Sequence, residues 1–187
     1  NISGSGRLIK TGTGVVTLTG TNTYAGGTTV SGGALQGTTS SLQGNIVNNA
    51  AVGFAQGTDG VYAGNMSGTG GLTKTGAGRV MLTGTNTYAG GTVVSGGALF
   101  GTAESLQGNI VNNAAVGFDT TSSGTYAGTM SGSGVLAAFG AGTLILTGNN
   151  TYTGGTAIAG GSVLQLGNGG TTGMIAGNVD IESGGVL

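Results

Sequence analysis

Two acidic residues near the end of the chain, Asp180 and Glu182, are the one pair whose types and spacing could support catalysis. Residues two apart on a β-strand point to the same face. Glycoside hydrolysis needs two carboxyl groups about 5–9.5 Å apart across the scissile bond. The corresponding positions of an internal repeat, described below, hold Val47 and Asn49. We therefore expect a solvated outer strand face here and no catalytic residue.

The other charged residues suggest little chemistry. Lys10 and Lys74 recur at one position of the repeat, with Arg7 and Arg79 nearby, and could make weak contacts to an anion or a glycan. We expect instead that they lie on a solvated strand edge. The variable segments "AQGTDG" and "DTTSSG" carry Asp59 and Asp119, which we expect to be loop residues that aid solubility.

The composition excludes several functional classes. The 187 residues include 46 glycines, four basic and five acidic residues, and no His, Cys, Pro or Trp. Without His or Cys, the usual ligands of zinc, copper and haem are missing, and so are His-dependent triads. Four scattered cations make no nucleic-acid footprint. We therefore expect no cofactor, no metal and no nucleic-acid partner.

The remaining question is whether such a chain folds. Disordered segments combine low hydrophobicity with high net charge, whereas this chain is 37% hydrophobic with a net charge of −1. It contains no apolar run of the length that crosses a membrane as a helix, so we expect no membrane insertion of this segment. The chain begins without Met or a signal segment, and we interpret it as a piece of a longer protein.

A 64-residue repeat organises the sequence. The string "LTG(T/N)NTY" begins at Leu18, Leu82 and Leu146, and residues 1–64 and 65–128 are identical at 47 of 64 positions. The third copy, residues 129–187, is more divergent. We predict one solenoid domain over 1–187, made of modules 1–64, 65–128 and 129–187, because fixed-period repeats are typical of such architectures.

Shorter periods inside the module suggest the fold. Apolar residues alternate over four to six positions between Gly, Asn and Thr, which predicts short strands, and the glycine content disfavours helices. An apolar residue, a variable residue and Gly recur at Tyr24, Leu42, Tyr62 and Tyr88, so the successive steps are 18, 20 and 26. These features predict an all-β fold, a right-handed parallel β-helix of about eight to nine coils of 18–26 residues.

This spacing also predicts a corner and a side-chain stack. Tight corners favour positive φ and hence Gly. The expected corner residues are Gly26, Gly44, Gly64, Gly90, Gly108, Gly128, Gly154 and Gly177. The expected stack beside them is Tyr24, Leu42, Tyr62, Tyr88, Leu106, Tyr126 and Tyr152, with Tyr24–Leu42, Leu42–Tyr62 and Tyr62–Tyr88 as neighbours. Exposed tyrosines could instead form a glycan platform, but the adjacent glycines favour packing.

Two longer segments resemble a known family. They are "GRLIKTGTGVVTLTGTNTYAGGTTVSGGAL" at residues 6–35 and "GGLTKTGAGRVMLTGTNTYAGGTVVSGGAL" at residues 70–99. Both resemble the autotransporter-associated β-strand repeat, also called the passenger-associated transport repeat. In the third copy Ala138 and Phe139 replace the Lys and Thr of the pattern. The resemblance implies a parallel β-helix in the passenger of a bacterial type V secreted protein, outside the outer membrane, and passengers of this kind are often adhesins.

These observations favour a non-enzymatic structural segment of a secreted or surface-exposed β-solenoid, such as a passenger shaft, stalk or adhesin spacer. One alternative is a subunit of an extracellular fibre, assembled by head-to-tail stacking, because open solenoid ends expose strand edges. A glycan-binding or glycan-cleaving β-helix is a third, less favoured. The expected partners are flanking coils or copies of the chain, and host-surface or matrix glycans or proteins.

Overall fold

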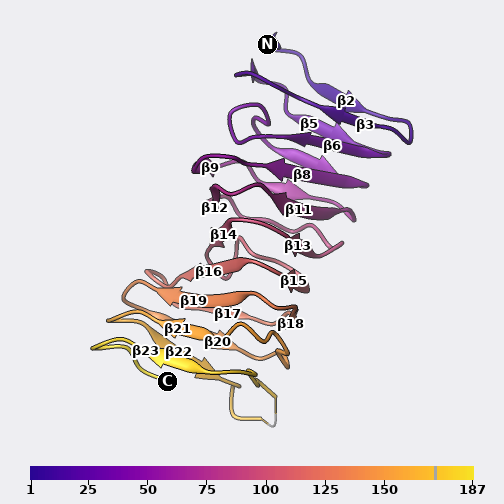
Figure 1. Ribbon diagram of the computed structural model, residues 1–187. Helices are drawn as coiled ribbons and strands as arrows, with labels where there is room; N and C mark the ends of the chain where they lie inside the picture. The colour runs from indigo at the N-terminus through magenta and orange to yellow at the C-terminus, as the bar shows by residue number, and fades with distance from the viewer. Residues whose placement is uncertain (171) are drawn as a thin grey trace.

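The chain forms a stack of parallel β-coils. The computed structural model describes residues 1–170 and 172–187, whose strands pair only in parallel. The coils follow one another along a single axis from the N-terminus at one end to the C-terminus at the other (Figure 1). Hydrogen bonds between adjacent coils join positions about 20 apart, as between Met66 and Asn86, so the chain makes about nine coils. The predicted all-β solenoid is therefore confirmed.

The strands of the described residues form five sheets along the stack. The two-stranded sheet contains β1 (Ser3–Gly4) and β4 (Thr23–Tyr24); the four-stranded sheet contains β2 (Leu8–Lys10), β5 (Thr28–Val30), β7 (Ile46–Asn48) and β10 (Met66–Ser67). The first seven-stranded sheet contains β3 (Val15–Thr17), β6 (Ala34–Gly37), β8 (Ala51–Ala55), β11 (Gly71–Thr75), β13 (Thr92–Val94), β15 (Ile110–Asn112) and β18 (Met130–Ser131).

The other two sheets lie further along the chain. The second seven-stranded sheet contains β9 (Gly60–Tyr62), β12 (Arg79–Leu82), β14 (Ala98–Gly101), β16 (Ala115–Asp119), β19 (Val135–Phe139), β21 (Thr156–Ile158) and β23 (Val179–Ile181). The three-stranded sheet contains β17 (Gly124–Tyr126), β20 (Thr143–Leu146) and β22 (Val163–Leu166). Such short strands gain stability mainly from stacking on neighbouring coils, so each coil depends on the next.

The coil length differs from the expected series. Leu8 pairs with Thr28, which pairs with Ile46, which pairs with Met66, so the residue number rises by 20, 18 and 20 at successive coils. Tyr62 pairs with Leu82, a further rise of 20. The predicted 26-residue step from Tyr62 to Tyr88, and with it that pair of neighbours, is wrong. The Tyr motif recurs with the period of the sequence module, and this period does not correspond to a whole number of coils.

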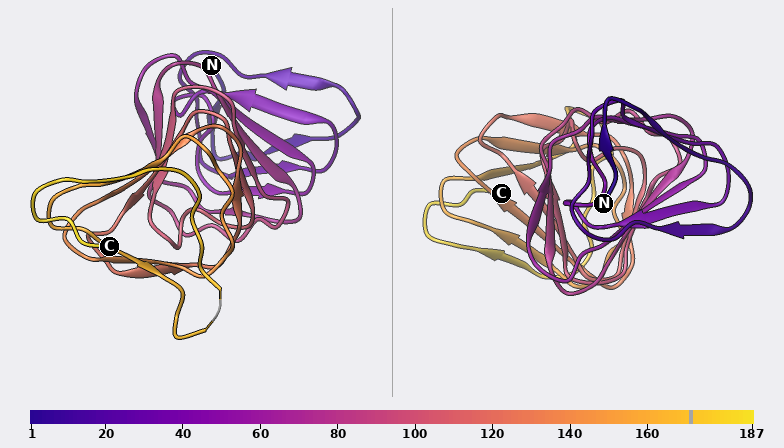
Figure 2. Two further views of the ribbon diagram at one scale, coloured as in Figure 1. Left: turned by 60° about the horizontal axis from the view of Figure 1, so that its bottom comes forward. Right: turned by 90° about the horizontal axis from the view of Figure 1, so that it is seen from above.

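Because the sequence module is longer than three coils, equivalent residues of successive modules lie at different positions around the solenoid axis. Three coils starting at Leu8 end at Met66, whereas the repeat equivalent of Leu8 is Leu72, six residues further along. The equivalent strands β2, β11 and β19 consequently lie in the four-stranded, the first seven-stranded and the second seven-stranded sheet. Seen along the axis, the indigo and purple coils reach to one side and the orange and yellow coils to the other (Figure 2).

A continuous apolar core fills the coils. Alternate residues of each strand point inward, as in the ladder Leu35, Val52 and Leu72, each at most 1% exposed. The next inward ladder places Phe54 against the Tyr62 ring, with ring centroids 5.1 Å apart. One cluster of buried residues extends from Val30 to Leu164. Coil-to-coil burial of apolar surface therefore stabilises the stack along most of its length.

Buried asparagines link successive coils. In the "NTY" motif, Asn22, Asn86 and Asn150 are at most 2% exposed. The Asn86 side chain accepts a hydrogen bond from the Met66 backbone N at 2.8 Å and donates one to the Ser105 carbonyl at 2.7 Å. One amide thus satisfies backbone groups in the coils on both sides, which explains why the motif needs Asn at a buried position.

Candidate functional site

The predicted corner glycines have two different roles. Gly44, Gly108 and Gly177 have φ of 63°, 65° and 86°, the left-handed region that favours glycine. The remaining five, Gly26, Gly64, Gly90, Gly128 and Gly154, do not have positive φ. They lie close to the preceding coil instead. A Cβ atom on Gly26 would come within 2.7 Å of the Gly6 carbonyl. A single left-handed corner is therefore wrong for these five positions.

The side chains of the predicted stack are buried. Tyr24, Tyr62, Tyr88, Tyr126 and Tyr152 are at most 3% exposed, as are Leu42 and Leu106. Each tyrosine hydroxyl has a hydrogen-bond partner nearby. The Tyr62 hydroxyl, for example, donates to the Gly44 carbonyl at 2.7 Å. Rings enclosed in this way cannot serve as an exposed glycan platform.

Burial also makes Tyr62, Tyr88, Tyr126 and Tyr152 weaker acids. It raises the pKa of Tyr152 to about 12. It raises the pKa of Tyr62, Tyr88 and Tyr126 well above the ordinary value. These hydroxyls are therefore hydrogen-bonding groups at neutral pH and supply no base.

The two repeated lysines lie inside the solenoid. Lys10 is 6% exposed and Lys74 is 0% exposed. The Lys74 Nζ donates to the carbonyls of Thr75, Gly76 and Gly96 at 2.8, 2.9 and 3.0 Å. Burial lowers the pKa of Lys74, and the nearby Asp59 acts in the opposite direction. The expectation of a solvated strand edge is wrong, because each lysine occupies an inward position of its strand and ties two turns together.

Where the third module lacks the lysine, hydroxyl groups make the same connection. Ala138 replaces the lysine, and the Ser162 Oγ donates to the Gly140 carbonyl at 2.9 Å. The Thr120 Oγ1 donates to the Phe139 carbonyl at 3.0 Å. Among the described residues, no buried side-chain nitrogen or oxygen atom lacks a hydrogen-bond partner. The lysines are thus structural groups whose role other polar residues can take over.

The acidic residues do not converge on a reaction centre. Asp180 is exposed in β23, and Glu182 is exposed directly after this strand. Glu104 is exposed and borders a polar depression. Asp119 accepts hydrogen bonds from the backbone N and the hydroxyl of Thr121 at 2.9 and 2.6 Å. Within residues 1–170 and 172–187, no three His, Cys, Asp or Glu side chains are grouped to hold a metal ion.

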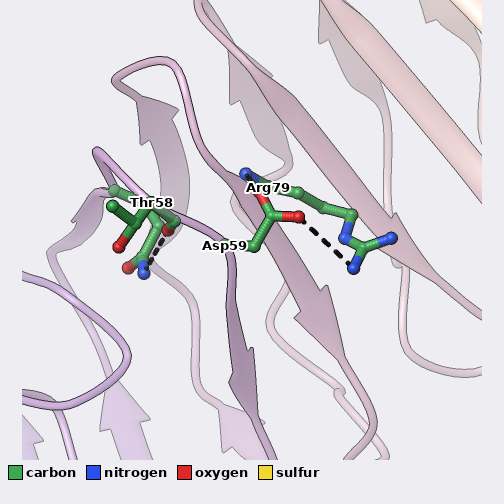
Figure 3. A network of polar contacts seen from close by, with 4 residues as sticks. Thr58, Asp59 and Arg79 are labelled. Carbon is green, nitrogen blue, oxygen red and sulfur yellow. Dashed lines mark hydrogen bonds and ion pairs between the residues drawn. The ribbon is translucent and has the colours of Figure 1, made fainter.

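Sequence reasoning missed an aromatic cluster on the outer surface. Phe100 of β14 and Phe139 of β19 lie outward on the second seven-stranded sheet with ring centroids 5.1 Å apart. The Arg79 guanidinium lies 5.5 Å from the Phe100 ring centroid and pairs with Asp59 at 3.4 Å. Asp59 also accepts a hydrogen bond from the Arg79 backbone N at 2.8 Å (Figure 3). We call Asp59, Arg79, Phe100 and Phe139 the aromatic patch.

A signal for this patch is present in the sequence. The repeat equivalents of Phe100 and Phe139 in other modules include Gln36 and Thr75. The departures from the repeat were visible, but placing them on one surface required the true coil period.

No helix in the described part of the chain has the length and apolar character needed to cross a membrane.

Comparison with known proteins agrees with this architecture. The family described as Passenger-associated-transport-repeat matches residues 8–36, 72–99 and 136–166. An adhesin autotransporter, BmaC of Brucella suis biovar 1 (strain 1330), is 40% identical over 83 residues, which cover 42% of this chain and 2% of the relative. No solved structure matches the chain.

The chain therefore carries three passenger-associated-transport repeats, as the resemblance implied. Each match begins at a strand leucine, Leu8, Leu72 or Leu136, and ends beyond the "NTY" motif. The two lysines and the buried asparagines thus lie within the repeat itself. The match covers 2% of the adhesin relative, so nearly all of its own length lies outside the comparison.

Proposed function

We propose that this chain is a non-enzymatic structural segment of a bacterial autotransporter passenger, exposed on the cell surface or secreted. Its mechanical role is to extend the passenger as a shaft or spacer. The observation that carries the proposal is the uninterrupted coil-to-coil pairing with a buried core along the stack. The passenger repeats and the adhesin relative support the surface location.

Solenoid stability is approximately a sum of repeat and neighbour terms, so a whole module can be removed. We test this with a variant lacking residues 65–128, which joins two equivalent positions of the repeat. The expected product is a folded rod that small-angle scattering shows to be shorter by about 16 Å, or three and a third coils at about 4.8 Å each. A variant that is unfolded at 25 °C would contradict the proposal.

Surface location needs a separate experiment. The chain, inserted with an epitope tag into an autotransporter passenger, should become accessible to antibody on intact bacteria. A tag that antibody reaches only after the outer membrane is permeabilised would contradict the proposed location. As a control, the same tag is placed on a passenger that lacks this segment. Its exposure shows that the carrier itself is secreted.

Head-to-tail self-association is a second candidate function. Apolar side chains at inward strand positions are exposed near both ends of the stack: Val16 of β3 is 40% exposed, and Ile181 of β23 is 48% exposed. Such edges can pair with flanking coils or with a second copy, and repeated end-to-end contacts make a filament. Light scattering and electron microscopy distinguish the two roles, since filaments of the purified chain would favour self-association and a monomeric rod would favour the spacer.

A further inference from the structure

The aromatic patch combines two part-covered rings with an exposed ion pair. The side chains of Arg79 and Asp59 are 44% and 63% exposed, while Phe100 and Phe139 are each partly exposed. The two rings approach each other above Gly117, where a Cβ atom would lie 2.7 Å from ring atoms of Phe100. The glycine thus lets rings from two different coils meet on one surface.

The patch is assembled from residues that depart from the repeat. Asp59 belongs to the first module, Arg79 and Phe100 to the second, and Phe139 to the third. The first seven-stranded sheet contains the same three strands one module earlier, β6, β8 and β11. There Gln36 and Thr75 replace the two phenylalanines on the same backbone pairing. The fold therefore does not require aromatic rings at these positions.

The size and charge of the patch restrict its partner. A stable protein interface buries about 800 Å² on each side, far more than two part-covered rings provide, whereas one or two rings suffice for the apolar face of a sugar. Because Arg79 is paired with Asp59, the patch has no net charge to attract an anion, and it offers hydrogen-bond donors and acceptors side by side. These are the groups that sugar hydroxyls need.

We propose that the aromatic patch binds a pyranose ring of a neutral glycan. Phe100 and Phe139 contact the apolar face of the sugar, and Arg79 and Asp59 hydrogen-bond its hydroxyl groups. The inference rests on the proposed function, because a surface-exposed passenger meets such glycans. It goes beyond that function by assigning the shaft a binding surface of its own.

The test uses the full 187-residue chain and two immobilised probe panels. One panel holds neutral β-galactosides, β-glucosides and α-mannosides, and the other holds their sialylated counterparts. Wild-type chain should bind at least one neutral glycoside and should bind the sialylated forms no better. Absence of binding to the whole neutral panel, or binding to the sialylated panel alone, would overturn the proposal.

Paired variants connect any binding to the patch. The double variant Phe100→Gln/Phe139→Thr introduces residues that the first seven-stranded sheet already carries, and it should weaken binding at least about tenfold. The matched control Val93→Thr/Val111→Thr removes exposed apolar side chains from the outer face of that other sheet. It should leave binding unchanged. Equal binding by the patch variant, or equal loss by the control, would contradict the assignment.

A separate readout distinguishes this inference from the proposed function. Failure to bind glycans while the module deletion still gives a shorter folded rod would overturn the inference alone. Light scattering tests the other possible occupant, a second copy of the chain. If the wild-type chain is a dimer and Phe100→Gln/Phe139→Thr abolishes the dimer, then a second copy covers the patch. That result would overturn the glycan assignment.

Discussion

Two strips of the solenoid have the same backbone pairing and different side chains. Strands β6, β8 and β11 form the strip in the first seven-stranded sheet, and β14, β16 and β19 form its equivalent in the second. Inside, the first strip has Lys74 where the second has Ala138; outside, the first has Gln36 where the second has Phe100. The comparison shows that the ladder tolerates exchanges on both faces, provided that buried backbone groups stay paired.

Residue exchanges at inward and outward positions of the strips have different consequences. Inside, the ammonium group of Lys74 and the hydroxyls of Thr120 and Ser162 are alternative donors to turn carbonyls, so the change preserves stability. Outside, Gln36 and Phe100 satisfy no comparable requirement. An outward exchange therefore alters what the surface can bind, while an inward exchange alters only how the turn is held.

The largest expected effect is the loss of the buried lysine. Lys74→Met should lower the free energy of unfolding by about 3 kcal/mol, because the Gly76 and Gly96 carbonyls lose a buried charged donor. Denaturant unfolding measures this change. Arg7→Met, which alters an exposed cation, is the control and should change stability by less than about 0.5 kcal/mol. Equal effects of the two substitutions would show that the inward contacts are not structural.

High pH should act equally on the tyrosines that pack against the two strips, Tyr62 against Phe54 of β8 and Tyr126 against Phe118 of β16. Phe54–Tyr62 and Phe118–Tyr126 have the same centroid separation of 5.1 Å and the same interplanar angle of 55°. Because burial raises the pKa of both tyrosines, the folded state keeps protons that the unfolded state releases above about pH 10.

The stability that each tyrosine contributes is therefore complete below about pH 10 and is lost as pH rises through the folded pKa. At pH 11.5 each should cost about 2 kcal/mol relative to neutral pH. Tyr62→Phe and Tyr126→Phe should each remove that share of the pH dependence in denaturant titrations. Unequal effects of the two variants would show that the strips are not equivalent inside.

Adding a methyl group at the central glycine of each strip should affect stability differently, because different outer side chains lie next to the two glycines. On Gly117 the added Cβ would lie 2.7 Å from Phe100 ring atoms and 3.0 Å from Phe139, whereas on Gly53 it would lie 3.2 Å from the flexible Gln36 side chain. Gly117→Ala should therefore cost about 1.5 kcal/mol. Gly53→Ala should cost less than about 0.5 kcal/mol. Thermal unfolding compares them, and the reverse order would contradict the ring geometry.

The exchange of the outer rings is also expected to have a small effect. Phe100→Gln/Phe139→Thr should change the free energy of unfolding by less than about 1 kcal/mol, because the first strip already carries those residues. Calorimetry measures the change. A loss above about 3 kcal/mol would mean that the rings are needed for folding, and the argument for a binding surface would lose its basis.

Much of the fold could be predicted from the sequence. Gly-rich repeats and alternating strands indicated a β-solenoid, and the spacing of Tyr24, Leu42 and Tyr62 matched true coil steps. The step to Tyr88 failed because the module is longer than three coils. A repeat in sequence fixes which residues are equivalent, but it does not determine how many residues complete one turn in space.

The candidate site was less predictable for two physical reasons. Lys10 stands two residues after Leu8 on one strand, so alternation already placed it on the inward face; its charge led to the wrong expectation of exposure. The aromatic patch depends on contacts between modules, such as Asp59 with Arg79 and Phe100 with Phe139. These pairs follow only from the correct coil length, so no inspection of a single module could reveal them.

Cross-linking tests the coil length most directly, since the natural chain contains no cysteine. The outward neighbours Val61 and Met81 pair across adjacent coils. The account predicts that Val61→Cys/Met81→Cys is joined rapidly and intramolecularly by a short thiol cross-linker, while Val61→Cys/Thr87→Cys, which tests the 26-residue step, is not. Cross-linking of the second pair in place of the first would contradict the pairing of adjacent coils described above, and with it the rotation of the modules.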